Sequence, residues 1–190
     1  MRLPQFALVC CSVAALAAAQ QTASESKPAV KLPLKANLVL TPEFCATKLK
    51  KGSALSGKET FAVGEASCPK LEEALGSVFS SLTKFDKVPD SGSAPGQVTL
   101  IPKFIDVGAT KTLWAKSKRE LVILIEWTVQ DATGKPVWVQ TVEGSAHNKA
   151  GNVFSAGKHR REIVDYAAED VAHNSAQKIA AAPELSKLTQ

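Results

Sequence analysis

The chain has 190 residues, of which 45% are hydrophobic and 22% are charged, and its formal net charge is +5. This length supports one domain with a hydrophobic core of its own, and so mild a positive charge gives no reason to expect a nucleic-acid-binding protein. Beyond the N-terminal segment no apolar run is longer than the five residues 121–125, which excludes a membrane-spanning helix from the mature chain.

The first 19 residues are typical of a cleavable signal peptide. Arg2 supplies a positive charge at the N-terminus, residues 6–19 are almost entirely apolar, and Ala17-Ala18-Ala19 before Gln20 fits the small-x-small pattern of a cleavage site. The apolar run is shorter than the ~20 residues that a membrane-spanning helix needs. The sequence therefore predicts an exported protein that is periplasmic or secreted.

The alternative is a lipid anchor at Cys11, on the outer membrane. The segment Leu8-Val9-Cys10-Cys11 resembles the lipobox of bacterial lipoproteins. Cys10 stands where that pattern has Gly, Ala or Ser, however, and the apolar run continues past Cys11, so we favour cleavage after Ala19. Residues 20–33 are rich in Gln, Ser, Thr, Ala and Lys, and we expect them to form a disordered leader or tether.

We expect a single domain over residues 34–183. Its first half is predicted to hold a strand at 34–40, an irregular segment, a short strand at 60–63 and a helix. The helix would begin at Cys68-Pro69 and end near 84–86, because one apolar stripe at helical spacing is formed by Leu71, Leu75, Val78, Phe79, Leu82 and Phe85. In an oxidising compartment Cys45 and Cys68 are either a disulfide or two separate thiols.

Three strands are predicted next. Residues 97–107 would form an edge strand or a bulged one because Pro102 lacks an N–H, residues 119–130 alternate clearly, and residues 136–143 return after a turn. Pairing Gln130 with Pro136 places Val129 opposite Val137 on a dry face. The same register places Trp138 on the other, amphipathic face together with Leu124 and Val142.

The C-terminal part is predicted as a loop at 144–157, a helix at 159–182 and a loose tail at 184–190. The helix carries a stripe of mostly small residues that would pack closely on the sheet: Ile163, Ala167, Val171, Ser175 and Ile179. The element order predicts an α+β two-layer sandwich, in which a mostly antiparallel sheet of about 4–5 strands carries two helices on one face.

With its signal peptide, its polar tether and this element order, the chain resembles the small periplasmic accessory proteins and lipoproteins of Gram-negative bacteria. Among them are LptE-like and YajG- or CsgG-like α+β modules. The resemblance extends from Leu34 to about Ala182 and rests on the first strand, the 71–85 helix, the 131–134 hairpin turn and the closing Ala-rich helix. It implies a non-catalytic role in envelope assembly or transport and assigns no functional residue.

The mature chain contains no nucleophile elbow, no His-Glu-x-x-His, no glycine-rich phosphate loop and no Cys-x-x-Cys. His159 and His173 lie near acids on the last helix and are expected to be solvated rather than metal ligands. Ser145 and His147 share one predicted loop, which leaves a small hydrolase as a minority hypothesis. We therefore expect a protein that is not an enzyme and that needs no cofactor or metal.

Two surface features suggest a partner-binding role. Between two strands the sequence 110–119 places an apolar pair among cations, a mixture suited to a membrane interface, a glycan or an acidic protein surface: Lys111, Leu113, Trp114, Lys116, Lys118 and Arg119. The second feature is Trp138 with Leu124 on the amphipathic sheet face. The main hypothesis is an exported binding or assembly module that contacts an envelope protein, an anionic surface or a lipid. The alternatives are a soluble carrier of an apolar ligand and the small hydrolase.

Overall fold

The computed structural model describes residues 31–53, 57–89, 94–110, 119–148 and 156–188. The predicted signal peptide, Cys11 and most of the predicted leader lie outside these ranges. The elements, in chain order, are β1 (Leu32–Val39), α1 (Pro42–Cys45), β2 (Leu49–Ser53), β3 (Gly57–Phe61), α2 (Val63–Gly76), β4 (Phe79–Phe85), β5 (Gln97–Thr110), β6 (Arg119–Gln130), β7 (Pro136–Asn148), α3 (Ala156–Ala180) and α4 (Pro183–Lys187).

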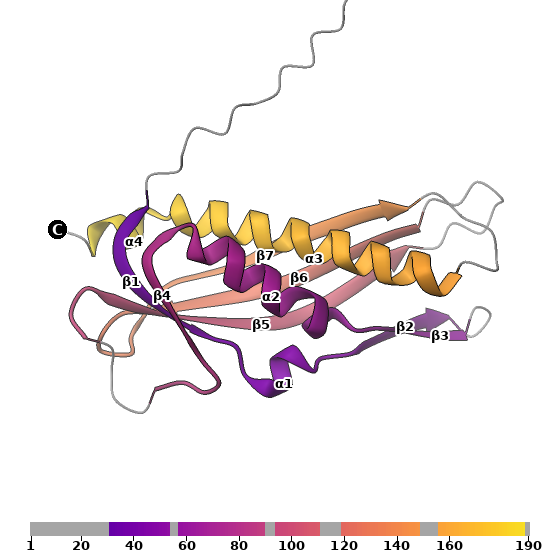
Figure 1. Cartoon of the computed structure of the whole chain (residues 1–190), viewed down its shortest axis with the longest axis horizontal. Helices are drawn as coiled ribbons and strands as arrows, with labels where there is room; N and C mark the ends of the chain where they lie inside the picture. Colours follow the sequence, from indigo (N-terminus) through magenta and orange to yellow (C-terminus); the bar gives the residue numbers. More distant parts are fainter. Residues whose placement is uncertain (1–30, 54–56, 90–93, 111–118, 149–155, 189–190) are drawn as a thin grey trace, which may run out of the picture.

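A five-stranded sheet in the order β4-β1-β5-β6-β7 carries α2 and α3 on one face, which confirms the α+β class (Figure 1). Its strand directions are mixed, whereas the sequence predicted a mostly antiparallel sheet. The pairs β5–β6 and β6–β7 are antiparallel, but β1 is parallel to both β4 and β5. The parallel β1–β4 pair arises because α2 crosses over the sheet and returns the chain at the same end.

Helix α2 ends at Gly76, about nine residues before its predicted end, and begins at Val63 rather than at Cys68. Pro69 consequently lies inside the helix, not in its first turn. After Gly76 the apolar residues Val78 and Phe79 still fall at helical spacing, but they lead into β4, which pairs in parallel with β1. As a strand, β4 forms backbone hydrogen bonds with β1 that it could not form as part of a longer helix. Pairing with β1 therefore overrides the helical spacing of the apolar residues.

Strand β6 has the predicted bounds, whereas its pairing with β7 differs from the predicted register. Gln130 does pair with Pro136, but Val137 is then bulged out and Val129 pairs with Trp138 instead. The one-residue shift moves Trp138 to the inner face, where it is half-buried against the core. The prediction that Trp138 shares a face with Leu124 is therefore wrong, because a bulge reverses the side of each residue that follows it.

Two boundaries near the C-terminus also differ from the sequence prediction. β7 continues to Asn148, so Ser145 and His147 lie on a strand and not in a loop. The predicted loose tail instead contains α4, whose Leu185 is fully buried and anchors it to the domain. The predicted stripe on the long helix is confirmed, since Ile163, Ala167, Val171, Ser175 and Ile179 are all buried on α3.

A buried hydrogen bond joins the sheet to α3. The indole Nε1–H of Trp127 on β6 donates to the Ser175 hydroxyl at 2.9 Å, and this hydroxyl donates to the Val171 carbonyl at 2.6 Å. Trp127 and Ser175 are both fully buried. Trp127, the largest fully buried side chain, is therefore held by a polar contact as well as by packing.

Replacing Ser175 by Ala should lower the free energy of unfolding by about 2 kcal/mol, because the Trp127 indole N–H stays buried without an acceptor. Urea unfolding checks the value. In a double-mutant cycle, Ser175→Ala should cost much less in a Trp127→Phe background, where no indole N–H is present. An equal cost in both backgrounds would contradict the account.

Candidate functional site

The inner face of the sheet is closed by α3. Gly144 on β7 faces this helix, and a Cβ atom placed there would lie 2.2 Å from the Val171 backbone nitrogen and 2.5 Å from its Cα. The backbones of helix and strand are thus in direct contact, which only the absence of a side chain at residue 144 permits. With Trp127 and Val142 also fully buried, this face is structural and leaves no gap for a ligand between helix and sheet at this point.

Helix α3 also occupies part of the free edge of β7. Asp170 accepts a hydrogen bond from the Ser145 N–H at 2.8 Å, Asn174 donates to the Glu143 carbonyl at 2.9 Å, and Lys178 lies 3.5 Å from the Thr141 carbonyl. Four helical residues rise about 6 Å, close to the ~6.7 Å that two strand residues span, so the helix and strand stay in step. These contacts protect an edge that could otherwise pair with another strand.

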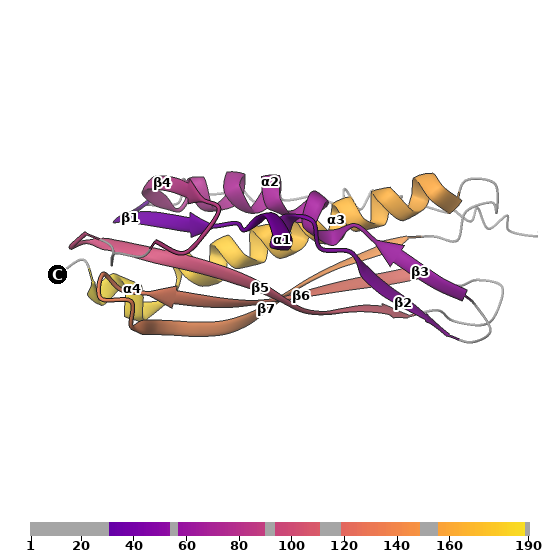
Figure 2. The ribbon, with the colours of Figure 1, turned by 90° about the horizontal axis from the view of Figure 1, so that it is seen from below.

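The opposite face of strands β5, β6 and β7 carries no helix of the described chain (Figure 2). We call this surface the outer face and define its apolar part by five aliphatic side chains: Ile101, Ile105, Val122, Leu124 and Val139. Ile105 is 48% exposed and Val139 is 57% exposed, whereas the other three are half-buried. Ile101, Val122 and Leu124 each stand between two buried residues, as the alternation of a sheet requires. Val139 pairs with Thr128, whose two neighbours are buried, and Ile105 is the unpaired residue of a bulge in β5.

A polar row crosses the outer face between the aliphatic side chains. Lys103 on β5 pairs with Glu126 on β6, and Glu126 pairs with Thr141 on β7. The row next to it holds Ile101, Thr128 and Val139. The outer face is therefore amphipathic, as the sequence predicted for one side of this hairpin. Charges in the centre suit contact with a protein surface, whose own polar groups can pair with them, better than burial in lipid tails.

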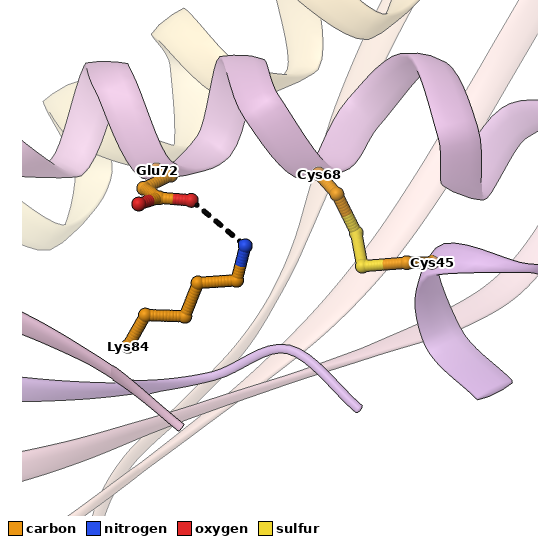
Figure 3. Close-up of polar contacts among 4 residues, drawn as sticks. All are labelled: Cys45, Cys68, Glu72 and Lys84. Atoms are coloured by element: carbon orange, nitrogen blue, oxygen red, sulfur yellow. Dashed lines mark hydrogen bonds and ion pairs between the residues drawn. A yellow bond between two sulfur atoms is a disulfide. The ribbon is translucent and has the colours of Figure 1, made fainter. Parts of the chain in front are cut away.

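The short helix α1 is held by a disulfide and by a pair of stacked rings. Cys45 at the end of α1 is bonded to Cys68 in α2, with 5.7 Å between their Cα atoms (Figure 3). Next to the bridge the ring of Phe44 stacks on Phe104 of β5 at 4.3 Å between centroids. One turn further along α2, Lys84 of β4 donates to Glu72 at 3.0 Å (Figure 3). The bridge thus fixes α1, and with it the start of the β2–β3 hairpin, to α2, and the stacked rings hold α1 against β5.

A cavity of about 140 Å³ lies at the other end of the sheet, where the β6–β7 turn meets α4. Its lining is mostly apolar and consists of Leu34, Gly96, Gln97, Val98, Asp131, Ala132, Thr133 and Leu188. The Thr133 hydroxyl donates to the Asp131 carboxylate at 2.6 Å. This hydrogen bond is the main cause of the lowered pKa of the Asp131 carboxyl. Pockets for drug-sized ligands usually measure about 300 Å³ or more, so this cavity is small for a lipid.

The residues singled out from the sequence have different fates. Leu124 lies on the outer face, as expected. Trp138 does not, because the bulge turns it inward. Arg119 is the first residue of β6, and its side chain lies outside the described part of the chain. The remaining residues of the predicted aromatic and basic loop fall outside the described residues: Lys111, Leu113, Trp114, Lys116 and Lys118.

The residues of the hydrolase hypothesis lie on one strand. Ser145 is half-buried and its backbone N–H binds Asp170, while His147 is exposed two residues further on. Residues two apart on a strand are about 6.7 Å apart along its axis. Among the residues that the structure describes, no group of three His, Cys, Asp or Glu side chains could hold a metal ion. In the same part of the chain no helix is long and apolar enough to cross a membrane.

Sequence reasoning missed the contacts of Asp170, Asn174 and Lys178 with the β7 edge. The signal was their spacing of four residues along one side of α3, beside the buried stripe. It gains meaning once the helix is known to run along an edge strand, which the sequence did not indicate. Val139 was likewise not singled out, because the assumed register placed it opposite Trp127 on the dry face.

No protein-family model and no curated protein matches the chain. Solved structures are similar to it. A minor lipoprotein from Acinetobacter baumannii is 13% identical with a TM-score of 0.51, covering 78% of this chain and 94% of the lipoprotein. A candidate lipoprotein from Caulobacter crescentus is 16% identical with a TM-score of 0.43, covering 63% and 82%. A Xanthomonas campestris protein of family DUF330 is 5% identical with a TM-score of 0.46, covering 82% and 90%.

These neighbours come from Gram-negative bacteria, and two of them are described as lipoproteins. At 13% identity the Acinetobacter likeness shows a shared fold and nothing about the activity of this chain. The named LptE-, YajG- and CsgG-like modules stay a prediction from the sequence.

Proposed function

We propose that this protein is an exported, non-enzymatic binding module of the bacterial cell envelope, and that it contacts another envelope protein through the outer face. The observation that supports this best is the contrast between the two sides of one sheet. The inner side is packed against α3 down to backbone contact at Gly144, whereas the outer side exposes Ile105 and Val139. A sheet face that is apolar, extended and free of any described helix suits a docking surface.

The chemistry of the outer face favours a protein partner over a lipid. Lys103 and Glu126 lie side by side in the centre of the face, and Glu143 lies beside Leu124. Contact with lipid tails would remove these charges from water without giving them new partners. For each charged group this costs on the order of several kcal/mol, as for other buried charges. A protein surface with an apolar strip and its own charges can satisfy both kinds of residue.

The carrier alternative is less well supported by the same geometry. Its ligand would need a space between helices and sheet, yet Trp127, Val142 and Ala167 are fully buried in that layer. The cavity at the end of the sheet measures about 140 Å³. That volume is about half of the lower value typical of ligand pockets.

The test uses the mature protein purified from its own envelope and measured by native mass spectrometry. Ile105→Lys combined with Val139→Lys should abolish the complex with a protein partner, because both side chains are exposed and a buried, unpaired ammonium group opposes docking. The matched control is Tyr166→Lys, at a site on α3 that is 64% exposed on the other side of the molecule. The control should retain the complex at the wild-type level.

Three results would overturn the proposal. The double variant could retain the partner, the Tyr166→Lys control could lose it equally, or the purified protein could carry a lipid and no protein. Thermal unfolding of all variants should agree with the wild type within about 3 °C, since surface substitutions usually change stability by less than about 0.5 kcal/mol.

A further inference from the structure

Cationic segments that lie far apart in the sequence converge at one end of the fold. The β2–β3 hairpin lies at this end, β6 begins there at Arg119 paired with Asn148 of β7, and α3 begins there at Ala156 (Figure 1). β2 contacts β5, and β3 contacts α3. We call this region the basic end and define it by the described residues 48–53, 57–59, 119–120 and 156–162.

The basic end concentrates the positive charge of the described chain. It contains eight lysines and arginines and three acids, Glu59, Glu120 and Glu162, for a net charge of +5. The other described residues contain nine lysines and arginines and thirteen acids, for a net charge of −4. The described part of the chain thus has its positive and negative charge at different places, which its modest net charge conceals.

Exposed side chains make this charge accessible. Lys48 and Lys50, which flank half-buried Leu49, are exposed to solvent. Arg161 on α3 is exposed as well. The N-terminus of the 25-residue helix α3 adds the positive end of its dipole at the same place. Lys48 and Lys50 lie where the β2–β3 hairpin begins and Arg161 lies near the start of α3, whereas the cavity of about 140 Å³ lies at the opposite end.

We propose that the basic end binds the surface of a bilayer that contains anionic phospholipids, and so orients the protein on the membrane. Lys48 and Lys50 at the start of the hairpin and Arg161 on α3 belong to separate elements, so an extended anionic surface can meet them at once, whereas a peptide segment would meet one element at a time. Attraction of this kind needs no pocket and acts over about a Debye length. The inference is independent of the outer face, which lies on a different side of the molecule.

The experiment measures co-sedimentation of the mature protein with vesicles of equal parts phosphatidylcholine and phosphatidylglycerol, and with vesicles of phosphatidylcholine alone. Binding to the anionic vesicles is expected, and it should weaken as salt is raised. The variant Lys48→Glu/Lys50→Glu/Arg161→Glu should bind the anionic vesicles at least about tenfold more weakly, since each cation near the surface contributes separately.

The matched control reverses three exposed cations at the opposite end, Lys31→Glu/Lys135→Glu/Lys187→Glu. It has the same net charge as the first variant, so it should retain anionic binding within about twofold if the position of the charge matters. Equal loss in both variants would overturn the proposal, as would equal binding to both kinds of vesicle or no binding to the anionic ones. Circular dichroism of each variant verifies that it is folded.

Discussion

Replacing Gly144 by Ala should lower the free energy of unfolding by about 3 kcal/mol or more, although the substitution adds a single methyl group. The added Cβ would lie 2.2 Å from the Val171 backbone nitrogen and 2.4 Å from the Val171 Cβ. The obstructing atoms belong mainly to the backbone of α3, so no side-chain rotation relieves the clash. The helix must instead move away from the sheet.

Gly76→Ala is the matched control for this substitution. Gly76 is the last residue of α2, its added Cβ meets no atom within 4 Å, and its φ is not in the left-handed region. Alanine there should stabilise the protein by about 0.5 kcal/mol through reduced freedom of the unfolded chain. Urea unfolding of both variants measures the difference. A Gly144→Ala variant as stable as the wild type would mean that α3 does not rest on β7 as described.

Removing the Cys45–Cys68 disulfide should lower the free energy of unfolding by about 3 kcal/mol, because the bridge closes a loop of 23 residues in the unfolded chain. The effect can be measured on the wild-type sequence by urea unfolding with and without a reductant. It can also be measured on the double variant Cys45→Ala/Cys68→Ala.

The loss should have a local component as well. The bridge joins α1 to α2, and α1 leads directly into the β2–β3 hairpin (Figure 3). Amide hydrogen exchange after reduction should therefore accelerate more in Leu49 and Phe61 than in Ile125 in the centre of β6. Uniform acceleration, or a stability change under about 1 kcal/mol, would contradict the role we assign to the bridge.

The sequence predicts well those elements whose buried residues repeat regularly, once per helical turn or at every second strand position. Both ends of β6 agree with the prediction, because the alternation of side chains between the two faces of the sheet runs through Leu121, Ile123 and Ile125 without interruption. The α3 stripe was predicted because small residues at steps of four are typical of a helix that packs closely on a sheet. The predicted end of α2 near 84–86 was wrong. Leu71, Leu75 and Phe79 fall at helical spacing, but the chain changes to a strand after Gly76.

The candidate site was less predictable because it depends on register. A single bulged residue, Val137, decides whether Trp138 faces the core or the solvent, and nothing in the local composition marks it. Leu124 was placed on the outer face because β6 has no irregularity before it. The convergence of the Lys48, Arg119 and Arg161 segments depends on topology, which brings together residues more than 100 positions apart in the sequence.

Site-specific photo-crosslinking in living cells tests the central claim most directly. A photoreactive residue at Val139 on the outer face should give one protein adduct of discrete mass, which disappears when Ile105→Lys is added on the same face. The same residue at Tyr166, which is at least as exposed, should give none. An adduct at Tyr166 without one at Val139, or an adduct at Val139 that persists with Ile105→Lys, would contradict the claim that this protein works through the outer face.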